Sequence, residues 1–538
     1  MRRPIFPTPS SDGLNSAAPG LDPTGERVLL TVFASTFAAR APIRVIVSQI
    51  RRDRGGPRSR LALVDRERLA EHLAAPAGRG VRPSGAHHGV AGGAACGDLI
   101  RLSLRVDGDR VAAAGFEASG CGAMTAAGSA AVTLVEGDGV LDAARVGAHD
   151  IAAELGGLSP GKFHAADLAA DALHRALGAA ARAGAAVPAD GGRTLVAMSG
   201  GVDSAVAALL TGDGAVGVTL ELWSDPANDA EASCCSAHAV RVARSLAHGM
   251  GMPHFTLDLR DEFRAGVVEP FLAGHAEGVT PNPCVLCNGH VRLDAMVGFA
   301  DRLGAAALAT GHYARRTEHG LLRAAADPAK DQTYMLAAVA PETLERLRFP
   351  LGELTKPEVR ALAAAAELPV ASKAESQDLC FLAGTGKAAF LARHGALDDR
   401  PGEVVDSAGG IVGRHRGHHR FTVGQRRGLG IGAAEPLYVL RKDAAANRVT
   451  VGPRAALATR GVPIRGARLH RPGAEVDAVK LRYRSRPIAC RVAGAPAAGT
   501  HARLELELED PVDGAAPGQT ACLLRGDEIV GWGTIAAA

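Results

Sequence analysis

Two cysteines lie two residues apart in a proline-containing segment, Pro281-Asn282-Pro283-Cys284-Val285-Leu286-Cys287-Asn288, and a third, Cys380, follows much later in the chain. Thiolates are strong nucleophiles, and a cysteine can carry transferable sulfur as a persulfide. Three thiolates can also hold a [4Fe–4S] cluster with one open iron, and Cys-x-x-Cys suits zinc as well. The residue types therefore indicate sulfur or metal chemistry. An inert or redox-active pair is the plain alternative.

A second segment whose residue types could take part in chemistry is Ser199-Gly200-Gly201-Val202-Asp203-Ser204. It lies between an apolar stretch and a helical pattern. Glycines let the backbone approach an anion, and the unpaired amides of a helix start then bind it. Asp203 is a poor phosphate ligand, so we assign it a magnesium-bridging role. The lysine of a Walker loop is absent from this segment. The pattern predicts a phosphate loop, although a turn that merely needed glycines would look similar.

Strands and helices alternate around this loop. Apolar strands are expected at 194–198, 216–222 and 254–259, helices at 206–210 and 237–248, and a helix end followed by a strand at 302–310. Such alternation predicts a parallel sheet covered by helices, a Rossmann-like α/β domain.

The chain before and after this domain has a different character. Residues 63–185 combine a period-two hairpin (98–106 and 111–116) with helical patterns at 123–136 and 166–182, which predicts a small α+β domain. Residues 186–192 are a predicted linker, 193–400 the nucleotide-binding domain, and 401–538 a β-barrel-rich region with short strands at 479–484, 502–508 and 520–524. We expect 1–62 to be a disordered extension or an over-long gene start, and an Arg-rich transit peptide is the alternative.

Composition excludes several classes of protein. The 538 residues carry a net charge of +3, too little for a protein that holds nucleic acid by bulk charge. A local basic cluster at 414–427 could still contact RNA, and a solvated loop is its ordinary explanation. No apolar run is long enough to span a membrane. Nine cysteines are too few for a disulfide scaffold, so we expect a reducing, cytoplasmic setting.

The six remaining cysteines form three pairs. Two pairs have no assigned catalytic role, and the role of the third follows only from a family resemblance. Cys234 and Cys235 precede a predicted helix and stay unassigned. Cys490 and Cys522 lie in strand-like patterns, where a buried cysteine usually acts as a small hydrophobic residue. Cys96 and Cys121 belong to the predicted N-terminal domain.

Residues 193–538 resemble the MnmA-type tRNA-specific 2-thiouridylases, a family with a PP-loop of the ATP pyrophosphatases. The resemblance rests on six ordered segments: 197–204, 280–283, 309–315, 327–334, 349–356 and 422–430. It implies that ATP adenylates the 2-carbonyl oxygen of the wobble uridine. A persulfide on Cys380 then attacks that carbon and AMP leaves, while Cys287 acts as the nucleophile that resolves the persulfide.

The same resemblance implies the remaining site residues. ATP would be bound by Ala197, Met198, Ser199, Gly200, Gly201, Val202, Asp203, Ser204, Leu220 and Gly311. His312 would support catalysis. The residues expected to touch tRNA are Asn282, Pro283, Cys284, Lys330, Asp331, Gln332, Arg482, Tyr483 and Gln519.

One departure from this family concerns Cys284, where many relatives carry aspartate. The resulting Cys-x-x-Cys, together with Cys380, leaves a persulfide route and an iron–sulfur cluster on Cys284, Cys287 and Cys380 equally open.

Residues 64–182 resemble the IscU/NifU-type iron–sulfur scaffolds, on the segments 95–98, 118–123 and 162–166. This resemblance implies a site for zinc or a labile cluster on Cys96, Asp98, Cys121 and His164. The family's third cysteine is replaced by Ala165, which removes the thiol expected to accept sulfur most readily. A degenerate domain kept for docking is the alternative.

The sequence as a whole predicts a cytoplasmic, ATP- and Mg²⁺-dependent tRNA-uridine 2-sulfurtransferase fused to a module that supplies sulfur or clusters. Its expected partners are tRNA and a cysteine desulfurase or another sulfur-relay protein, with no membrane. A PP-loop ligase for a small metabolite is one alternative, although no glutaminase segment is evident. A non-catalytic iron–sulfur carrier with regulatory ATP binding is the other.

Overall fold

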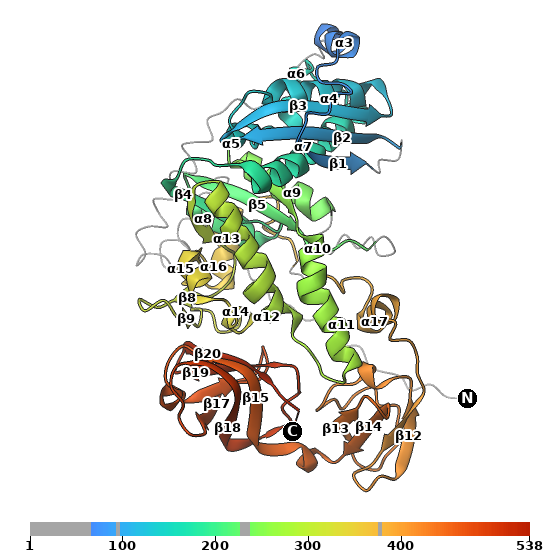
Figure 1. Ribbon diagram of the computed structural model, residues 1–538, viewed down its shortest axis with the longest axis vertical. Helices are drawn as coiled ribbons and strands as arrows, with labels where there is room; N and C mark the ends of the chain where they lie inside the picture. Colours follow the sequence, from blue (N-terminus) through green and yellow to red (C-terminus); the bar gives the residue numbers. More distant parts are fainter. Residues whose placement is uncertain (1–65, 93–96, 226–236, 375–378, 538) are drawn as a thin grey trace, which may run out of the picture. The chain divides into compact units, whose positions relative to one another are not determined.

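Figure 1 shows the computed structural model of the chain. The structure describes residues 66–92, 97–225, 237–374 and 379–537. The predicted extension 1–62, the predicted metal ligand Cys96 and the unassigned Cys234 and Cys235 lie outside the described residues. In the described part of the chain, no helix is both long and apolar enough to cross a membrane.

The N-terminal module (residues 66–185) is built on a three-stranded antiparallel sheet in its described part, in the order β1-β2-β3. The hairpin that period-two alternation predicted is present, and every second residue at the start of β2 is buried. The strands are β1 (His87–Gly92), β2 (Leu99–Asp107) and β3 (Arg110–Ser119). The helices are α3 (Arg66–Ala74), α4 (Gly122–Val135), α5 (Val140–Ala143), α6 (Ala148–Glu154), the short 3-10 helix η1 (Pro160–Lys162) and α7 (Phe163–Gly184). The module is therefore α+β, as expected.

The nucleotide domain follows, and its described residues contain a five-stranded, all-parallel sheet in the order β10-β7-β4-β5-β6. Its strands are β4 (Asp190–Ala197), β5 (Ala215–Glu221), β6 (His254–Asp258), β7 (Ala305–Ala309) and β10 (Leu347–Arg348). The helices are α8 (Val202–Thr211), α9 (Ala237–Gly249), α10 (Arg260–Phe263), α11 (Glu269–Ala276), α12 (Pro283–Cys287), α13 (Leu293–Arg302), α14 (Thr333–Leu336), α15 (Pro341–Arg346) and α16 (Lys356–Ala365). Two π-helical turns, η2 (Arg264–Val268) and η3 (Asn288–Arg292), interrupt the run from α10 to α13. The predicted Rossmann-like sheet is confirmed.

The linker between the module and the nucleotide domain is held at both ends. The Ala186 amide donates to the Gly108 carbonyl at 2.9 Å, and the Val187 amide donates to the Arg302 carbonyl at 3.0 Å. The Asp190 amide donates to the Gly304 carbonyl at 2.9 Å, where β4 already begins. Residues 186–189 therefore form a fixed connection.

Helix α7 covers the outer edge of the sheet, where β6 is the last strand. The His174 ring donates to the His254 carbonyl at 2.7 Å, and the Arg182 guanidinium donates to the Asp258 carbonyl at 3.4 Å. Between them, a Cβ on Gly178 would meet the Thr256 carbonyl oxygen at 1.9 Å, so only glycine lets the helix come this close. Four residues of an α-helix rise by about 6.0 Å and two residues of a strand by about 6.6 Å. Every fourth residue of α7 can therefore contact every second residue of β6.

The same helix packs its other face on the module's own sheet, so most of its length is buried (Figure 1). Buried apolar residues of the module and of the parallel sheet, such as Leu177 and Phe255, belong to one continuous core. Because an uncovered sheet edge invites pairing with another chain, α7 protects β6 as well as completing this core.

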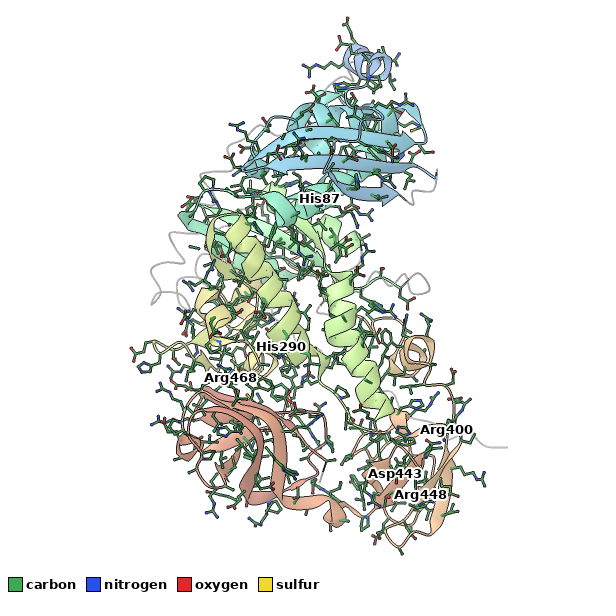
Figure 2. All side chains as sticks on the ribbon, viewed as in Figure 1. His87, His290, Arg400, Asp443, Arg448 and Arg468 are labelled. Carbon is green, nitrogen blue, oxygen red and sulfur yellow. The ribbon has the colours of Figure 1, made fainter. Side chains whose placement is uncertain are left out.

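The C-terminal region begins with α17 (Lys387–Gly395) and a four-stranded sheet in the order β12-β11-β14-β13, counted over the described residues. The strands are β11 (Gly402–Val405), β12 (Ile411–His415), β13 (Tyr438–Asp443) and β14 (Arg448–Gly452), and a 3-10 turn, η4 (His418–Arg420), lies between β12 and β13. Asp443 and Arg448 pair across the β13–β14 hairpin (Figure 2).

Within the described chain, the last sheet runs β15-β18-β17-β16-β19-β20-β9-β8, and an added β15–β20 pairing closes six of these strands into a barrel. Its strands are β8 (Arg315–Arg316), β9 (Leu322–Arg323), β15 (Ala458–Leu469), β16 (Ala478–Lys480), β17 (Ile488–Val492), β18 (Gly499–Asp513), β19 (Thr520–Arg525) and β20 (Glu528–Ile535), with the 3-10 turns η5 (Arg454–Leu457) and η6 (Gly473–Glu475). The predicted β-barrel-rich region is confirmed. The strand expected at 479–484 ends earlier, at Lys480, because residues 482–485 form a turn closed from the Ser485 amide to the Arg482 carbonyl.

Candidate ATP site and sulfur-transfer site

The predicted phosphate loop connects the end of β4 to the start of α8, as its sequence required. Gly200 has φ +67°, and a Cβ there would lie 2.7 Å from the Ala239 carbonyl oxygen, so glycine is needed for two reasons. The Ser199 amide donates to the Ser204 hydroxyl at 3.1 Å, and that hydroxyl donates to the Gly201 carbonyl at 3.0 Å. The serines thus shape the loop around the first turn of α8, whose amides and dipole suit an anion.

Two other predicted ATP residues lie at the carboxyl ends of neighbouring strands. Leu220 is buried near the end of β5, and Gly311 follows the end of β7. A Cβ on Gly311 would lie 2.9 Å from both the carbonyl carbon of Asp203 and the amide nitrogen of Ser204. Ligands of open α/β sheets bind at this end of the strands. The structure therefore brings the Gly311 segment against the phosphate loop.

Asp203 has two partners that the sequence patterns did not assign. The Lys356 ammonium donates to both carboxylate oxygens of Asp203, at 2.7 and 2.8 Å, and the Tyr313 hydroxyl donates to one of them at 2.9 Å. Lys356 is the first residue of α16, and its side chain is only 9% exposed. Both residues belong to segments that carried the family resemblance, which was the signal available to find them.

His312, the predicted support for catalysis, is partly exposed beside this loop and shares a 3.0 Å hydrogen bond with the Thr310 hydroxyl. Burial, with a smaller contribution from the Arg292 charge, lowers the pKa of His312 to about 3. The ring is therefore neutral at physiological pH and can orient a group by hydrogen bonding without adding charge.

The predicted tRNA residues come from four distant segments that meet near α12. Asn282 is the N-cap of α12 and accepts from the Val285 amide at 3.4 Å. Just before it, the Thr280 carbonyl accepts from the Gln519 amide group at 2.7 Å, and the Thr280 amide donates to the Pro517 carbonyl at 2.8 Å. The barrel thus holds the start of the segment that carries Cys284 and Cys287.

The other two segments complete this junction. The Tyr334 hydroxyl donates to the Thr520 carbonyl at 2.8 Å, and the rings of Tyr334 and Tyr483 lie 6.3 Å apart. Lys480 reaches Asp331 at 3.4 Å. Burial raises the pKa of Tyr483, and a smaller contribution from Cys284 places that thiol in the same neighbourhood.

The remaining predicted tRNA residues have distinct local roles. The Gln332 side chain accepts from the Tyr313 amide at 2.9 Å, so it supports the phosphate-loop side of the domain. Arg482 is exposed in the turn after β16 and donates to the Gly514 carbonyl at 3.1 Å. Lys330 is partly exposed in the turn before Asp331.

The three thiols of the predicted sulfur site differ in burial. Cys287 is buried in the main core, whereas Cys284 and Cys380 are partly exposed. Cys380 packs against the extended core to which Cys287 belongs, but the Sγ atoms of Cys284, Cys287 and Cys380 do not all lie within 4.8 Å of one another. Cys490 and Cys522 are buried in the barrel sheet, where burial raises each thiol's pKa to about 12. Both barrel thiols are therefore poor nucleophiles.

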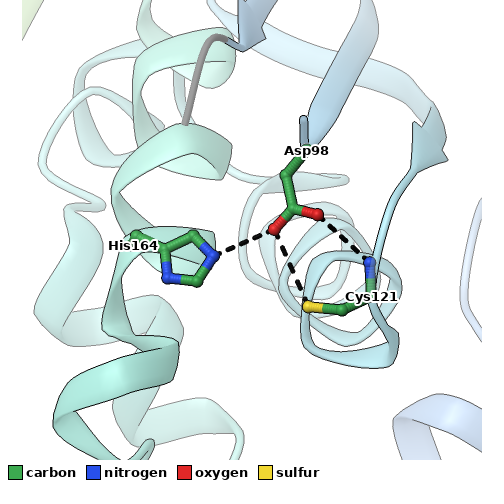
Figure 3. A group of neighbouring side chains, drawn as sticks. All are labelled: Asp98, Cys121 and His164. Atoms are coloured by element: carbon green, nitrogen blue, oxygen red, sulfur yellow. Dashed lines mark hydrogen bonds and ion pairs between the residues drawn. The ribbon is translucent and has the colours of Figure 1, made fainter. Parts of the chain in front are cut away.

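The N-terminal module brings three of its predicted metal ligands together (Figure 3). The donor atoms of Asp98, Cys121 and His164 all lie within 4.8 Å of one another, and no other described set of three acidic, histidine or cysteine side chains meets this criterion. Asp98 lies just before β2 and is buried, Cys121 is the N-cap of α4, and His164 is the second residue of α7. A Cβ on Gly120 would lie 2.0 Å from an Asp98 carboxylate oxygen, so glycine is required beside the site.

The geometry of His164 fits a cation. Its Nδ1 faces the Gly161 carbonyl at 3.1 Å, and its Nε2 faces Oδ2 of Asp98 at 2.9 Å. A carbonyl can only accept, so Nδ1 carries the hydrogen, and Nε2 then points a lone pair at a carboxylate. A metal ion bound here would take this nitrogen and this carboxylate oxygen as ligands. With the Cys121 thiol 3.7 Å from the same oxygen, the set offers nitrogen, oxygen and sulfur to zinc or to a cluster iron.

Comparison with known proteins agrees with this organisation. The model of the NifU-like N terminal domain matches residues 64–183, and that of the tRNA methyl transferase HUP domain matches 192–384. The models of the tRNA methyl transferase PRC-barrel domain and the aminomethyltransferase beta-barrel domain match 388–453 and 472–535. A bifunctional protein NifU/MnmA from Rubrobacter xylanophilus is 45% identical over 488 residues, which is 87% of this chain and 98% of the relative. The chain belongs to the NifU/MnmA family.

Relatives without the N-terminal module are also similar. A tRNA-specific 2-thiouridylase MnmA from Methylorubrum extorquens is 45% identical over 362 residues, 64% of this chain and 93% of the relative. One from Zymomonas mobilis is 41% identical over 352 residues, again 64% of this chain and 93% of the relative. In this NifU/MnmA chain, therefore, the module precedes a nearly complete MnmA-like part, and both predicted resemblances are confirmed.

Proposed function

We propose that this chain is an ATP-dependent tRNA-uridine 2-sulfurtransferase that introduces sulfur at position 2 of the wobble uridine. The observation that carries the proposal is the meeting of four distant segments around α12, because it joins the barrel, two tyrosines and the Cys284–Cys287 turn beside a nucleotide domain. The partly exposed Tyr483 ring offers a face on which an unpaired base can stack. The match to 2-thiouridylases over the whole of this region supports the same reaction.

In the activation step, the phosphate loop and the start of α8 bind the phosphates, with Leu220 and Gly311 lining the nucleotide site. The uridine 2-oxygen forms a bond to the α-phosphorus, the bond to the bridging oxygen breaks, and pyrophosphate leaves with that electron pair. Asp203 offers carboxylate oxygens for Mg²⁺, which would neutralise phosphate charge when bound. Neutral His312 orients the reacting groups.

In the sulfur step, the terminal sulfur of a Cys380 persulfide bonds to carbon 2, and AMP leaves with the electron pair of the carbon–oxygen bond. The Cys287 thiolate then attacks the γ-sulfur of Cys380. A Cys287–Cys380 disulfide forms, the bond between Cys380 Sγ and the transferred sulfur breaks, and 2-thiouridine leaves with that sulfur and the electron pair of the broken bond. A dithiol reductant must restore both thiols, and a persulfide donor must reload Cys380 for the next turnover.

Recognition of tRNA rests on the junction around α12. Asn282, Pro283 and Cys284 are the proposed contacts to the target base, and Lys330, Asp331, Gln332, Arg482, Tyr483 and Gln519 are the proposed surrounding contacts. The N-terminal site on Asp98, Cys121 and His164, with Cys96 as a further ligand, is proposed to bind zinc or a labile cluster and to serve sulfur supply. A cysteine desulfurase or another sulfur-relay protein is the proposed source of sulfur.

The proposal is tested by thiolation of a tRNA transcript with the purified chain, ATP, Mg²⁺ and a persulfide donor, read by nucleoside mass spectrometry. Cys287→Ser and Cys380→Ser should each abolish 2-thiouridine, whereas Cys490→Ser, a barrel thiol, should retain it. ATP-dependent activity on a small metabolite with no tRNA product would support a ligase instead. Absence of any ATP-dependent product would support a carrier.

The iron–sulfur route uses the same thiols and is decided by metal analysis. Cys284, Cys287 and Cys380 would hold the cluster, whose open iron would supply a bound sulfide. Anaerobically purified chain should then contain iron and sulfide that are lost in Cys284→Ser. Iron-free chain that is fully active, with Cys284→Ser also active, would leave the persulfide route.

A further inference from the structure

A cavity of about 570 Å³ lies where the N-terminal module meets the parallel sheet. Residues of β1 and α7 form its wall on the module side, and the last residues of β5 and β6 with the first residue of α10 form the opposite wall. Cavities of roughly 300–1,000 Å³ are large enough for a small organic ligand. None of the residues assigned above to ATP, tRNA, sulfur transfer or the metal site lines this cavity, so it is a separate site.

The close packing of the backbones leaves this space open. A Cβ on Gly178 of α7 would meet a β6 carbonyl oxygen at 1.9 Å, and a Cβ on Gly89 of β1 would meet an α7 carbonyl oxygen at 2.0 Å. Both positions require glycine, so neither can carry a side chain that would fill the cavity. Ala179 adds only a methyl group, and Val90 and Leu257 add apolar surface. This floor can cover the apolar part of a ligand.

Two arginines of the cavity wall meet beside the last residue of β6. The Arg182 guanidinium of α7 donates to the Asp258 carbonyl at 3.4 Å, and the Arg260 guanidinium of α10 donates to the Asp258 carboxylate at 2.8 Å. Arg182 also pairs with Glu262 at 2.5 Å. The four side chains are between 43% and 50% exposed. Ion pairs as exposed as these contribute little to stability, so an incoming anion can replace either carboxylate.

The third arginine of the wall belongs to a buried ion pair. Arg175 donates to the Glu221 carboxylate at 2.6 Å and pairs with Asp171 at 3.3 Å, and none of these three side chains is more than 21% exposed. A buried charge that loses its partner is costly, so these groups stay paired when a ligand enters. The guanidinium groups available to a ligand are therefore those of Arg182 and Arg260, and each can bind a carboxylate through two parallel hydrogen bonds.

We propose that this cavity binds a small organic acid, with its carboxylate on Arg182 and Arg260 and its apolar part on Val90, Ala179 and Leu257. Each guanidinium of the wall already binds a carboxylate of the protein, which favours a carboxylate ligand over a cation or a neutral molecule. Both walls contribute contacts, so the ligand bridges the module and the nucleotide domain. This inference goes beyond the proposed function and does not depend on thiolation of tRNA.

The test is a titration of the full chain with butanoate, pentanoate and hexanoate, followed by ligand-observed NMR. Each added methylene group covers more of the apolar floor, so the dissociation constant should fall about fourfold per carbon. Hexanamide has nearly the same shape but no charge, and it should bind about tenfold more weakly than hexanoate because it cannot form the charged hydrogen bonds.

Variants locate the bound acid. Replacing both arginines, Arg182→Gln with Arg260→Gln, should weaken hexanoate binding about tenfold or more. Ala179→Phe places a ring on the floor and should abolish binding without changing any charge. Arg264→Gln, which changes an exposed arginine of η2 that pairs with Glu269, is the matched control and should bind hexanoate as the wild type does. Melting temperatures show whether each variant is folded.

Hydrogen exchange of the wild-type chain, read by mass spectrometry, gives a result that needs no variant. Hexanoate should slow exchange in β1, in the second half of α7 and at the start of α10. Protection confined to other segments would overturn the proposal. So would equal affinity for the three acids, no saturable binding of hexanoate, or an affinity that the arginine substitutions and Ala179→Phe leave unchanged.

Discussion

At the scale of single residues, the two adjacent glycines of the phosphate loop differ in how strictly their positions require glycine. Gly200 adopts a left-handed backbone and touches the Ala239 carbonyl, whereas Gly201 has an ordinary negative φ as the N-cap of α8. The sequence shows only a pair of glycines. Which one is indispensable follows from the position of α9 beneath the loop.

Gly200→Ala should therefore damage nucleotide binding far more than Gly201→Ala. A left-handed alanine costs about 1–2 kcal/mol, and its methyl would also press on the Ala239 oxygen. At Gly201 the nearest atom to an added methyl is the Ser199 hydroxyl at 3.5 Å. ATP titration of both variants is the measurement, and equal loss in the two would contradict this division.

His164→Ala should release the metal of the N-terminal module. The variant removes the nitrogen that faces Asp98, leaving a buried carboxylate and one thiol as described donors. Zinc and iron measured on the purified full chain should fall by about one site's content. His501→Ala, which changes a histidine in the barrel strand β18, should retain the metal, and retention in His164→Ala would remove this site from consideration.

At the scale of elements, α7 shows how one helix serves two sheets. Its sequence is helical throughout and rich in alanine, which predicted the helix within three residues at each end. The pattern of buried residues could not show the partner, because a helix buried on two sides loses its single apolar face. The contact between Gly178 and Thr256 is a tertiary contact, which a local sequence pattern cannot predict.

Gly178→Ala should therefore destabilise the whole nucleotide domain, since the added methyl would lie 1.9 Å from the Thr256 carbonyl oxygen. Forcing α7 away from β6 costs about 1–3 kcal/mol by the usual scale of overpacking. Gly161→Ala, in the short turn before α7, meets nothing within 4 Å and is the matched control. Thermal unfolding of Gly178→Ala and Gly161→Ala tests this prediction. Equal melting temperatures for the two variants would contradict the close packing of α7 on β6.

Sequence patterns predicted the order of domains, the hairpin, the parallel sheet and the phosphate loop because each depends on local periodicity or on glycine at a turn. They missed Lys356 and Tyr313 as partners of Asp203, because those contacts span more than 100 residues of chain. They overextended the strand at 479–484, where alternation continues into a turn closed by Ser485. Sequence periodicity therefore predicted local elements but could not predict the contacts between distant segments.

At the scale of the whole molecule, three histidines lie where the module meets the nucleotide domain. The ring centres of His174 and His248 are 5.1 Å apart, and those of His174 and His254 are 5.7 Å apart. Burial lowers the pKa of His248 to about 4 and holds the pKa values of His174 and His254 well below the ordinary value. Burial thus disfavours the protonated form of all three rings in the folded chain.

The free energy of unfolding should therefore fall as pH decreases from about 6.5 to 4. The unfolded chain binds protons on these histidines near pH 6.5, whereas the folded chain resists them, so stability is full above that pH and is lost below it. His248 alone can contribute up to about 3 kcal/mol. Urea unfolding at several pH values measures this slope. His248→Gln should flatten it, and His319→Gln, an exposed loop variant, should not.

Helix α7 begins with His164 of the candidate metal site and ends against β6, the edge strand of the parallel sheet. The N-terminal module and the MnmA-like part are consequently packed against each other rather than joined only by a linker. A gene divided after residue 185 would produce fragments that each present a surface made to be covered, and the fragments would recognise one another through it.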